Sequence, residues 1–300
     1  MFIKQLSIML ACIVSGASFF TIGVAYRVLR ISCYRCSSAD ASEYLQKKRD
    51  YLHATYNVQP VALTTDDNLS LSGLLILNEN ACSTVLLCHG YRGAKERLHR
   101  VLSFFPQAHI LMFDFRGHGQ SQGELISIGY YEQKDIKAAV DFIKTHEKTK
   151  QLPLVGFGFS MGAASLIGAA AQGVPFDGLI LDSSFARLDD QLTRSFEKRT
   201  GFPKFPFMPV TKRLFEWFAH YRVEQVRPVE SIQAIACPLF IVHSIDDDFT
   251  PVFNAHQLYE KATAKKELWL VSKSFHGKII KDYSDEYSKR VNNFLQTYIL

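Results

Sequence analysis

Residues 156–165, GFGFSMGAAS, place a serine among glycines, where its size and polarity suit neither a core nor a helix interior. A short apolar run, 152–156, ends just before this serine, and small residues suited to a helix follow it. The stretch Gly158 to Gly162 matches the GxSxG pattern in the strand, turn and helix context that the pattern requires. In that context the glycines allow a sharp turn that exposes the serine hydroxyl at the positive end of a helix. Ser160 is therefore the candidate nucleophile, against the alternative of a serine packed at a tight strand-helix crossing.

A serine hydroxyl is a weak nucleophile at neutral pH, so this hypothesis requires a histidine base and an acid farther along the chain. Both residue types follow apolar runs that read as strands. His276 comes after 267–271, and an aspartate run, 246–248, comes after 239–242. The order serine, acid, histidine is the one that the pattern uses. The alternatives are a surface-loop histidine and solvated or helix-capping carboxylates, and Asp182 at its own strand end is a less favoured acid.

Acyl transfer also needs two backbone N–H groups where negative charge develops on the substrate oxygen. Met161, directly after the serine, supplies the first. Tyr91, which follows His89-Gly90 on an earlier strand-end loop, is the predicted second donor, and Arg92 is the alternative if the loop is shifted by one residue. Three polar side chains on these loops are expected to be structural rather than catalytic: His89, Asp114 and His118. This chemistry requires no metal and no cofactor.

Short apolar, β-branched runs alternate with helical patterns over most of the chain. The expected strands are 61–65, 69–77, 84–88, 109–113, 152–156, 178–181, 239–242 and 267–271, and the expected helices are 94–105, 130–146, 161–171, 252–264 and 279–298. Such alternation predicts a mostly parallel sheet covered on both faces. Residues 66–68 read as the turn of an antiparallel hairpin that leads into the sheet. Ligands of these sheets bind beyond the carboxyl ends of the strands, where the candidate residues lie.

On these motifs the chain resembles an α/β-hydrolase of the serine aminopeptidase-like and BEM46-like group, over about residues 56–300. The resemblance rests on His89-Gly90, Phe113 to Gly119, Gly158 to Gly162, Asp182 to Phe185, and the loops that carry Asp247 and His276. It implies an α/β-hydrolase fold with a mostly parallel eight-stranded sheet, flanking helices and a helical lid inserted at about 186–230. It also implies the activity of an esterase or lipase.

The resemblance selects one acid from the aspartate run. In that group the acid commonly stands four residues after a strand-end histidine and precedes a Val-Pro-like pair, which here matches His243, Asp247 and Thr250-Pro251. The glycine usual after the histidine is Ser244 in this chain, so Asp246 and Asp248 stay open as alternatives.

The composition, charge and cysteine spacing of the chain argue against several other classes of function. The chain has 300 residues, of which 47% are hydrophobic and 21% charged, as in a globular protein with one large domain or two small ones. Its formal charge of +5 is spread along the chain without basic, aromatic-interleaved runs, so nucleic acid is not expected as a partner. The six cysteines show no zinc spacing. Cys33 and Cys36 form a lone CxxC, for which lipidation or a local disulfide are the alternatives to reduced thiols.

The amino-terminal segment, 1–30, is expected to be a single-pass transmembrane anchor. The 22 residues between Lys4 and Arg27 carry no charge, and a helix of that length spans about 33 Å, enough to cross a bilayer. A cleaved signal peptide ending near Gly23-Val24-Ala25 is the alternative. More positive residues follow the segment than precede it, which favours a cytoplasmic hydrolase domain over an exported one. Residues 31–55 are expected to form a juxtamembrane linker or helix.

The expected insertion at 186–230 is rich in aromatic residues and prolines. Above a serine nucleophile beside a membrane, it favours apolar or lipid-like esters, although its aromatics serve equally to fill the insertion's own small core. The expected function is therefore a serine hydrolase of carboxylic esters, with a small-molecule or lipid ester as substrate. A thioesterase or peptidase with the same triad is the alternative among enzymes, and a catalytically silent, membrane-anchored binding module is the alternative outside them.

Overall fold

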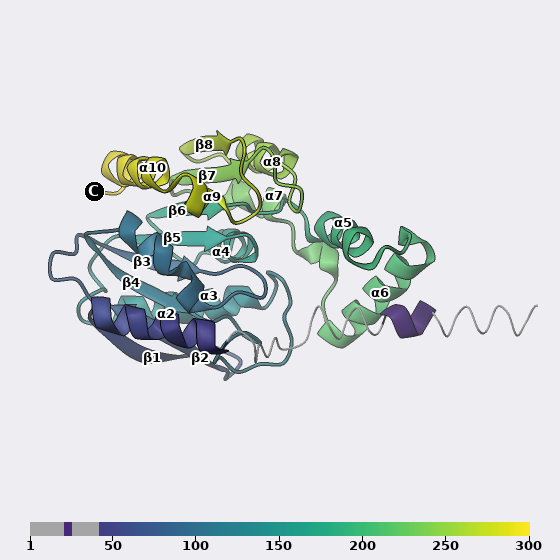
Figure 1. Ribbon diagram of the computed structural model, residues 1–300, viewed down its shortest axis with the longest axis horizontal. Helices are drawn as coiled ribbons and strands as arrows, with labels where there is room; N and C mark the ends of the chain where they lie inside the picture. The colour runs from purple at the N-terminus through teal and green to yellow at the C-terminus, as the bar shows by residue number, and fades with distance from the viewer. Residues whose placement is uncertain (1–20, 26–41) are drawn as a thin grey trace, which may run out of the picture.

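One eight-stranded sheet runs through this computed structural model, which describes residues 21–25 and 42–300 (Figure 1). The strands lie in the order β1-β2-β4-β3-β5-β6-β7-β8. Their bounds are β1 Val58–Thr64, β2 Ser70–Ile76, β3 Ser83–Cys88, β4 Ala108–Phe113, β5 Leu154–Phe159, β6 Gly178–Asp182, β7 Leu239–Ser244 and β8 Lys266–Val271. β1 and β2 form the predicted antiparallel hairpin, β2 pairs antiparallel with β4, and all other pairs are parallel. The predicted fold, an α/β-hydrolase with a mostly parallel eight-stranded sheet, is confirmed.

Helices cover both faces of the sheet and enclose two apolar clusters. One face packs against α3 (Glu132–Thr145), α4 (Met161–Ala171) and α8 (Phe253–Lys261). The other packs against the 3-10 helix η1 (Lys95–Phe104), α10 (Ser284–Tyr298) and α2 (Ser42–Thr55). Leu52 of α2 is fully buried, and Arg49 forms an ion pair with Glu96 of η1, so α2 is part of the packed domain. Burial on both faces explains why the central strands read as continuous apolar runs.

The expected strands and helices form with shifts of up to three residues at their ends, and two of the helices also differ in kind. β5 continues to Phe159 instead of ending at Gly156, because its glycines pair with β6, with Gly158 opposite Leu181. Glycine lowers strand propensity, but pairing with a distant strand overrides that preference. The expected helix 94–105 is a 3-10 helix. The expected helix 279–298 is divided into α9 (Ile279–Asp282) and α10 by Tyr283, whose φ of −130° and ψ of 36° are not helical.

Between β6 and β7 the chain forms the helical insertion, residues 186–230, which projects to one side of the sheet (Figure 1). It contains α5 (Leu188–Thr200), α6 (Lys204–Ala219), η2 (Val223–Gln225) and most of α7 (Pro228–Ser231), and η3 (Ile232–Ala234) follows. Its aromatic residues divide between two environments. Phe207 and Phe215 are buried, whereas Phe205 and Trp217 are 79% and 69% exposed. The insertion therefore has apolar packing of its own and still presents aromatic rings to solvent.

The predicted membrane segment lies outside the described residues except for 21–25, and Cys33 and Cys36 lie outside them as well. In the part of the chain that the structure describes, no helix combines the length and the apolarity needed to cross a bilayer. The anchor, its orientation and the signal-peptide alternative stay predictions.

Candidate active site

Ser160 lies on a strained turn between β5 and α4. Its φ of 53° and ψ of −113° form a conformation that a residue with a side chain adopts only when its surroundings enforce it. Here the Ser160 N–H donates to the carbonyl oxygen of Asp182 over 2.8 Å, and its carbonyl accepts the N–H of Ala164 over 3.1 Å. α4 begins at Met161, so the Met161 N–H lies in the first helical turn, where a helix offers no acceptor of its own. The turn therefore presents both a hydroxyl and a backbone donor.

Two glycines allow this turn through close approach rather than through an unusual φ. A Cβ on Gly162 would lie 2.3 Å from the carbonyl oxygen of Cys88 at the end of β3. A Cβ on Gly158 would lie 2.6 Å from backbone atoms of Ala163 in α4. Because both positions exclude any side chain, the GxSxG spacing lets α4 pack directly against β5 and the end of β3.

His276 brings its imidazole from the loop after β8 to the serine. Nε2 lies 3.1 Å from Ser160 Oγ, and Nδ1 lies 2.6 Å from Oδ2 of Asp247. The rings of Phe159 and Phe249 flank the imidazole, each with its centroid 5.0 Å from that of the imidazole. In one tautomer, Nδ1–H donates to the carboxylate and Nε2 accepts from the serine hydroxyl. The three predicted residues thus meet from the ends of β5, β7 and β8.

Asp247 is oriented by its own loop. Its carboxylate is fully buried, and Oδ1 accepts the N–H groups of Phe249 and Thr250 at 2.9 and 2.7 Å. These two bonds leave Oδ2 facing the imidazole of His276. Ser244, which replaces the usual glycine, donates its hydroxyl to the carbonyl of Ser274 at 2.5 Å and so joins the acid loop to the histidine loop.

The other aspartates of the run have different partners. Asp246 accepts the N–H of Lys273 at 2.6 Å. Asp248 is exposed and forms an ion pair with Lys198 of α5. Of the three aspartates that the sequence leaves open, Asp247 is the one in contact with the histidine.

The β3 loop, residues 89–93, runs beside the nucleophile turn and carries Tyr91. A Cβ on Gly90 would lie 2.8 Å from the ring of Phe159, so this loop packs on the residue before Ser160. The N–H of Arg92, the alternative donor, is directed to Nε2 of His118 at 3.1 Å. The predicted donors, Met161 and Tyr91, therefore lie on adjoining segments, whereas the N–H of Arg92 already has His118 as its acceptor.

A buried ion pair behind the β3 loop is not predictable from the sequence. Lys95 Nζ lies 2.6 Å from Oδ2 of Asp114, and the Lys95 N–H donates to Oδ1 at 2.8 Å. Both side chains are 1% exposed. The sequence predicts a structural role for Asp114. It does not predict the partner, because Lys95 stands at the start of an amphipathic pattern, where a lysine is normally exposed. The pair joins the start of η1 to the β4 loop, residues 114–119.

Asp182, the less favoured acid, has other partners than the histidine. Its fully buried carboxylate accepts the hydroxyls of Ser183 and Tyr287 at 2.7 and 2.9 Å. Burial raises the pKa of this carboxyl to about 6, and the two hydrogen bonds oppose that rise. The backbone carbonyl of Asp182 also accepts the Ser160 N–H, so Asp182 helps to hold the nucleophile turn in place.

Replacing Asp182 by asparagine is expected to flatten the pH dependence of the free energy of unfolding between about pH 4 and 6. The folded chain binds this proton more tightly than the unfolded chain, so the stabilisation is complete below about pH 4 and is lost as the pH rises through about 6. A rise from 3.8 to about 6 corresponds to about 3 kcal/mol. Urea unfolding across this range measures the effect, and parallel curves for the two proteins would contradict it.

Known proteins are similar to this chain in sequence and in fold. The family model described as Serine aminopeptidase, S33 matches residues 79–231. The chain is 30% identical to the protein YqkD of Bacillus subtilis (strain 168) over 230 residues, which is 75% of each chain. It is 27% identical to the lysophosphatidylserine lipase ABHD12 of Danio rerio over 196 residues, 61% of this chain and 48% of that protein. The esterase Pf2001 of Pyrococcus furiosus superposes with a TM-score of 0.69 at 26% identity, over 83% of this chain and 94% of that one.

The family match spans about half of the chain. It includes the β3 loop, the nucleophile turn and the helical insertion, while Asp247 and His276 lie beyond its end. The superposition on the esterase Pf2001 covers a larger share of the chain, 83%. The chain therefore belongs to the serine aminopeptidase S33 family of α/β-hydrolases.

Proposed function

We propose that this chain is a serine hydrolase that cleaves carboxylic esters through an acyl-enzyme. The observation that carries the proposal is the pair of contacts from Ser160 Oγ to His276 Nε2, 3.1 Å, and from His276 Nδ1 to Asp247 Oδ2, 2.6 Å. A nucleophile hydrogen-bonded to a base, and that base to an orienting acid, is the arrangement that activates a serine.

Each residue of the candidate site has its own role in the proposed reaction. His276 Nε2 takes the proton of Ser160 as Oγ bonds to the ester carbonyl carbon, and Asp247 stabilises the imidazolium. The N–H groups of Met161 and Tyr91 bind the oxyanion that forms. When the intermediate collapses, the bond to the alcohol breaks and the alcohol leaves with the proton from His276. Water, deprotonated by the same imidazole, then attacks the acyl carbon; the bond from that carbon to Ser160 Oγ breaks, Oγ takes the proton back from His276, and the carboxylic acid leaves.

We assign apolar or lipid-like acyl groups to this site. Two aromatic rings, Phe159 and Phe249, flank the imidazole, and the helical insertion presents Phe205 and Trp217 to solvent. Aromatic and apolar surfaces around a few polar groups suit an acyl chain. The names of two similar proteins, an esterase and a lysophosphatidylserine lipase, support the same class.

A labelling and hydrolysis experiment tests this function. The wild type should react with a fluorophosphonate probe and hydrolyse aryl esters in a series from acetyl to palmitoyl, with a preference for the longer chains. Ser160→Ala should lose the label and lower kcat by a factor of about 10⁶. The matched control is Ser165→Ala, which removes another buried serine hydroxyl on α4, bonded to the Met161 carbonyl, and should keep both properties.

Two outcomes would contradict the proposal. A wild type that neither takes the label nor cleaves any ester of the series would exclude the serine hydrolase. Faster cleavage of aminoacyl arylamides than of every ester would replace the esterase by a peptidase with the same residues.

A further inference from the structure

Two buried histidine rings hold the β3 loop. His89 Nδ1–H donates to the carbonyl oxygen of Gly90 over 2.7 Å. That carbonyl and the N–H of Tyr91 belong to one planar, trans peptide group, so they point in opposite directions. Fixing the carbonyl oxygen therefore fixes the direction of the Tyr91 N–H, the proposed oxyanion donor.

His118 holds the next peptide group of the same loop. Its Nε2 accepts the N–H of Arg92 at 3.1 Å, and its Nδ1–H donates to the carbonyl of Arg116 at 2.9 Å. The peptide group between Tyr91 and Arg92 is thereby fixed as well, so the two peptide groups that flank the Cα of Tyr91 are each held by one imidazole. Arg92 has a φ of 57°, which a residue with a side chain rarely adopts, and the hydrogen bond to His118 helps to hold it there.

Both rings must be neutral to make these contacts. Each one donates through Nδ1 and accepts a backbone N–H through Nε2, which for His89 is that of Phe115 at 3.1 Å. Burial lowers the pKa of both imidazoles, and the ring centroids lie 5.0 Å apart. A protonated ring would lose its acceptor and its bond to the backbone N–H.

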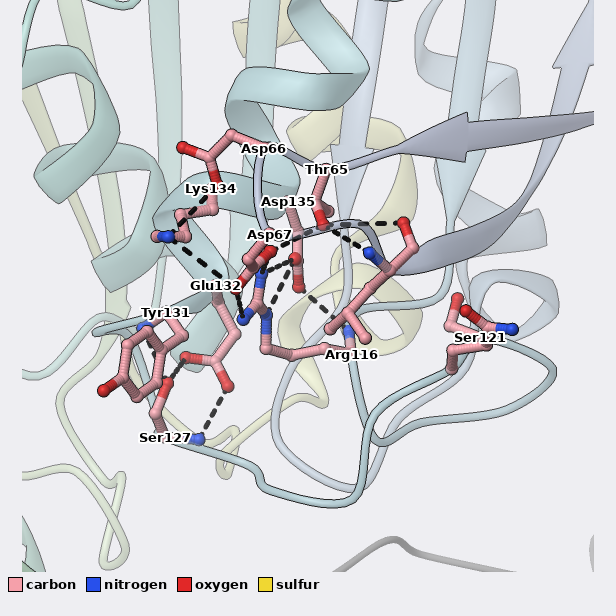
Figure 2. Close-up of polar contacts among 12 residues, drawn as sticks. Thr65, Asp66, Asp67, Arg116, Ser121, Ser127, Tyr131, Glu132, Lys134 and Asp135 are labelled. Atoms are coloured by element: carbon pink, nitrogen blue, oxygen red, sulfur yellow. Dashed lines mark hydrogen bonds and ion pairs between the residues drawn. The ribbon is translucent and has the colours of Figure 1, made fainter. Parts of the chain in front are cut away.

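The carbonyl that binds His118 is itself firmly placed. Figure 2 shows Arg116 between Asp67, in the turn after β1, and Asp135 of α3. The Arg116 N–H and Nε–H donate to Asp135 at 2.9 and 2.8 Å, and Nη1 donates to Asp67 at 2.8 Å. Thr65 and Lys134 in turn contact Asp67. His118 thus connects the β3 loop to a cluster of polar side chains on α3 and the β1–β2 hairpin.

We propose that His118 is a positioning residue for catalysis: by accepting the N–H of Arg92 it fixes the peptide group after Tyr91, while His89 fixes the one before it, and together they keep the Tyr91 N–H in its direction. The inference rests on the proposed function, because it concerns the stabilisation of the oxyanion in that reaction. His118 acts on the transition state through the loop, so its loss reduces kcat and leaves substrate binding nearly unchanged.

The variants His118→Gln and His118→Met separate this role from simple packing. Both side chains are flexible and similar in size, but only glutamine carries a strong acceptor that can replace Nε2, since the methionine sulfur is a weak one. Removal of a whole oxyanion donor lowers kcat by about 10²- to 10³-fold, so a misdirected donor should lower it by about 10-fold in H118M, with KM within about twofold. H118Q should keep kcat within about threefold of the wild type. The concentration of active sites is measured by titration with the fluorophosphonate, so that unfolded molecules are not counted when kcat is calculated.

A trifluoromethyl ketone inhibitor, which forms an oxyanion on Ser160, provides a second readout. In H118M its Ki should rise by the same factor by which kcat/KM falls, whereas H118Q should bind it like the wild type. Equal kcat and Ki values for H118M and the wild type would overturn the inference and leave the proposed function intact. Equal losses in H118M and H118Q would also overturn it, since packing would then account for both. A wild type without label or activity would overturn the proposed function and this inference together.

Discussion

Alanine in place of His276 is expected to lower kcat for ester hydrolysis by a factor of about 10⁶ while KM changes by less than about threefold. Nε2 of this ring is the acceptor 3.1 Å from Ser160 Oγ, and without it the hydroxyl keeps its proton at neutral pH. The remaining N–H donors still bind the substrate oxygen, so a small rate above that of water persists. Steady-state kinetics with an aryl ester of the preferred chain length measure the change.

A double variant gives this prediction its sharpest control. Because a nucleophile and its base act as one unit, Ser160→Ala combined with His276→Ala should be no slower than either variant alone. His256→Ala, which removes an exposed histidine from α8, should retain the wild-type rate. Multiplicative losses in the double variant would show that the two side chains act independently, contrary to the proposed mechanism.

The sheet is predictable from the sequence because its central strands are buried on both faces. All six residues of β3 and of β4 are buried, and each strand has a run of four apolar residues that ends at a polar or glycine-containing loop. Local sequence preference does not predict the end of a strand where pairing with a strand far away in the sequence determines it. β5 extends through Gly158 because that residue pairs with Leu181 of β6, an effect that no window of local sequence contains.

The candidate site is predictable for a topological reason. Parallel strands bring their carboxyl ends to one edge of the sheet, so residues that follow β5, β7 and β8 converge although they are far apart in the sequence. The choice among three adjacent aspartates does not follow from topology. It depends on the backbone of one loop, where the N–H groups of Phe249 and Thr250 turn Asp247 inward.

The sequence predicts structural roles for His89, Asp114 and His118 but not the partners through which they support the β3 loop. These contacts join loops that are separated along the chain, from Arg92 to His118 and from Lys95 to Asp114. A histidine between two glycines and a lysine at the start of an amphipathic pattern are ordinary surface residues by composition, yet His118 and Lys95 are both buried in the fold. Sequence patterns reveal which side chains lie at a strand end, whereas the direction in which a backbone N–H points is a property of the folded loop.

Replacing Asp247 by asparagine is expected to lower kcat by a factor of about 10⁴ with little change in stability. The asparagine carbonyl oxygen can still accept the N–H groups of Phe249 and Thr250, so the loop keeps its shape. Its NH₂ group then faces Nδ1 of His276, where the carboxylate oxygen stood 2.6 Å away. An NH₂ donor there favours the tautomer with the proton on Nε2, which cannot accept the proton of Ser160.

The two adjacent aspartates are matched controls for this variant, since each changes one carboxylate to an amide in the same loop. Asp246→Asn can still accept the Lys273 N–H through its amide oxygen, and Asp248→Asn loses only an exposed ion pair with Lys198. Both should retain kcat within about threefold of the wild type, because neither carboxylate touches the imidazole. If Asp246→Asn or Asp248→Asn lost as much activity as Asp247→Asn, a general requirement for negative charge in the loop would replace the specific contact between Asp247 and His276.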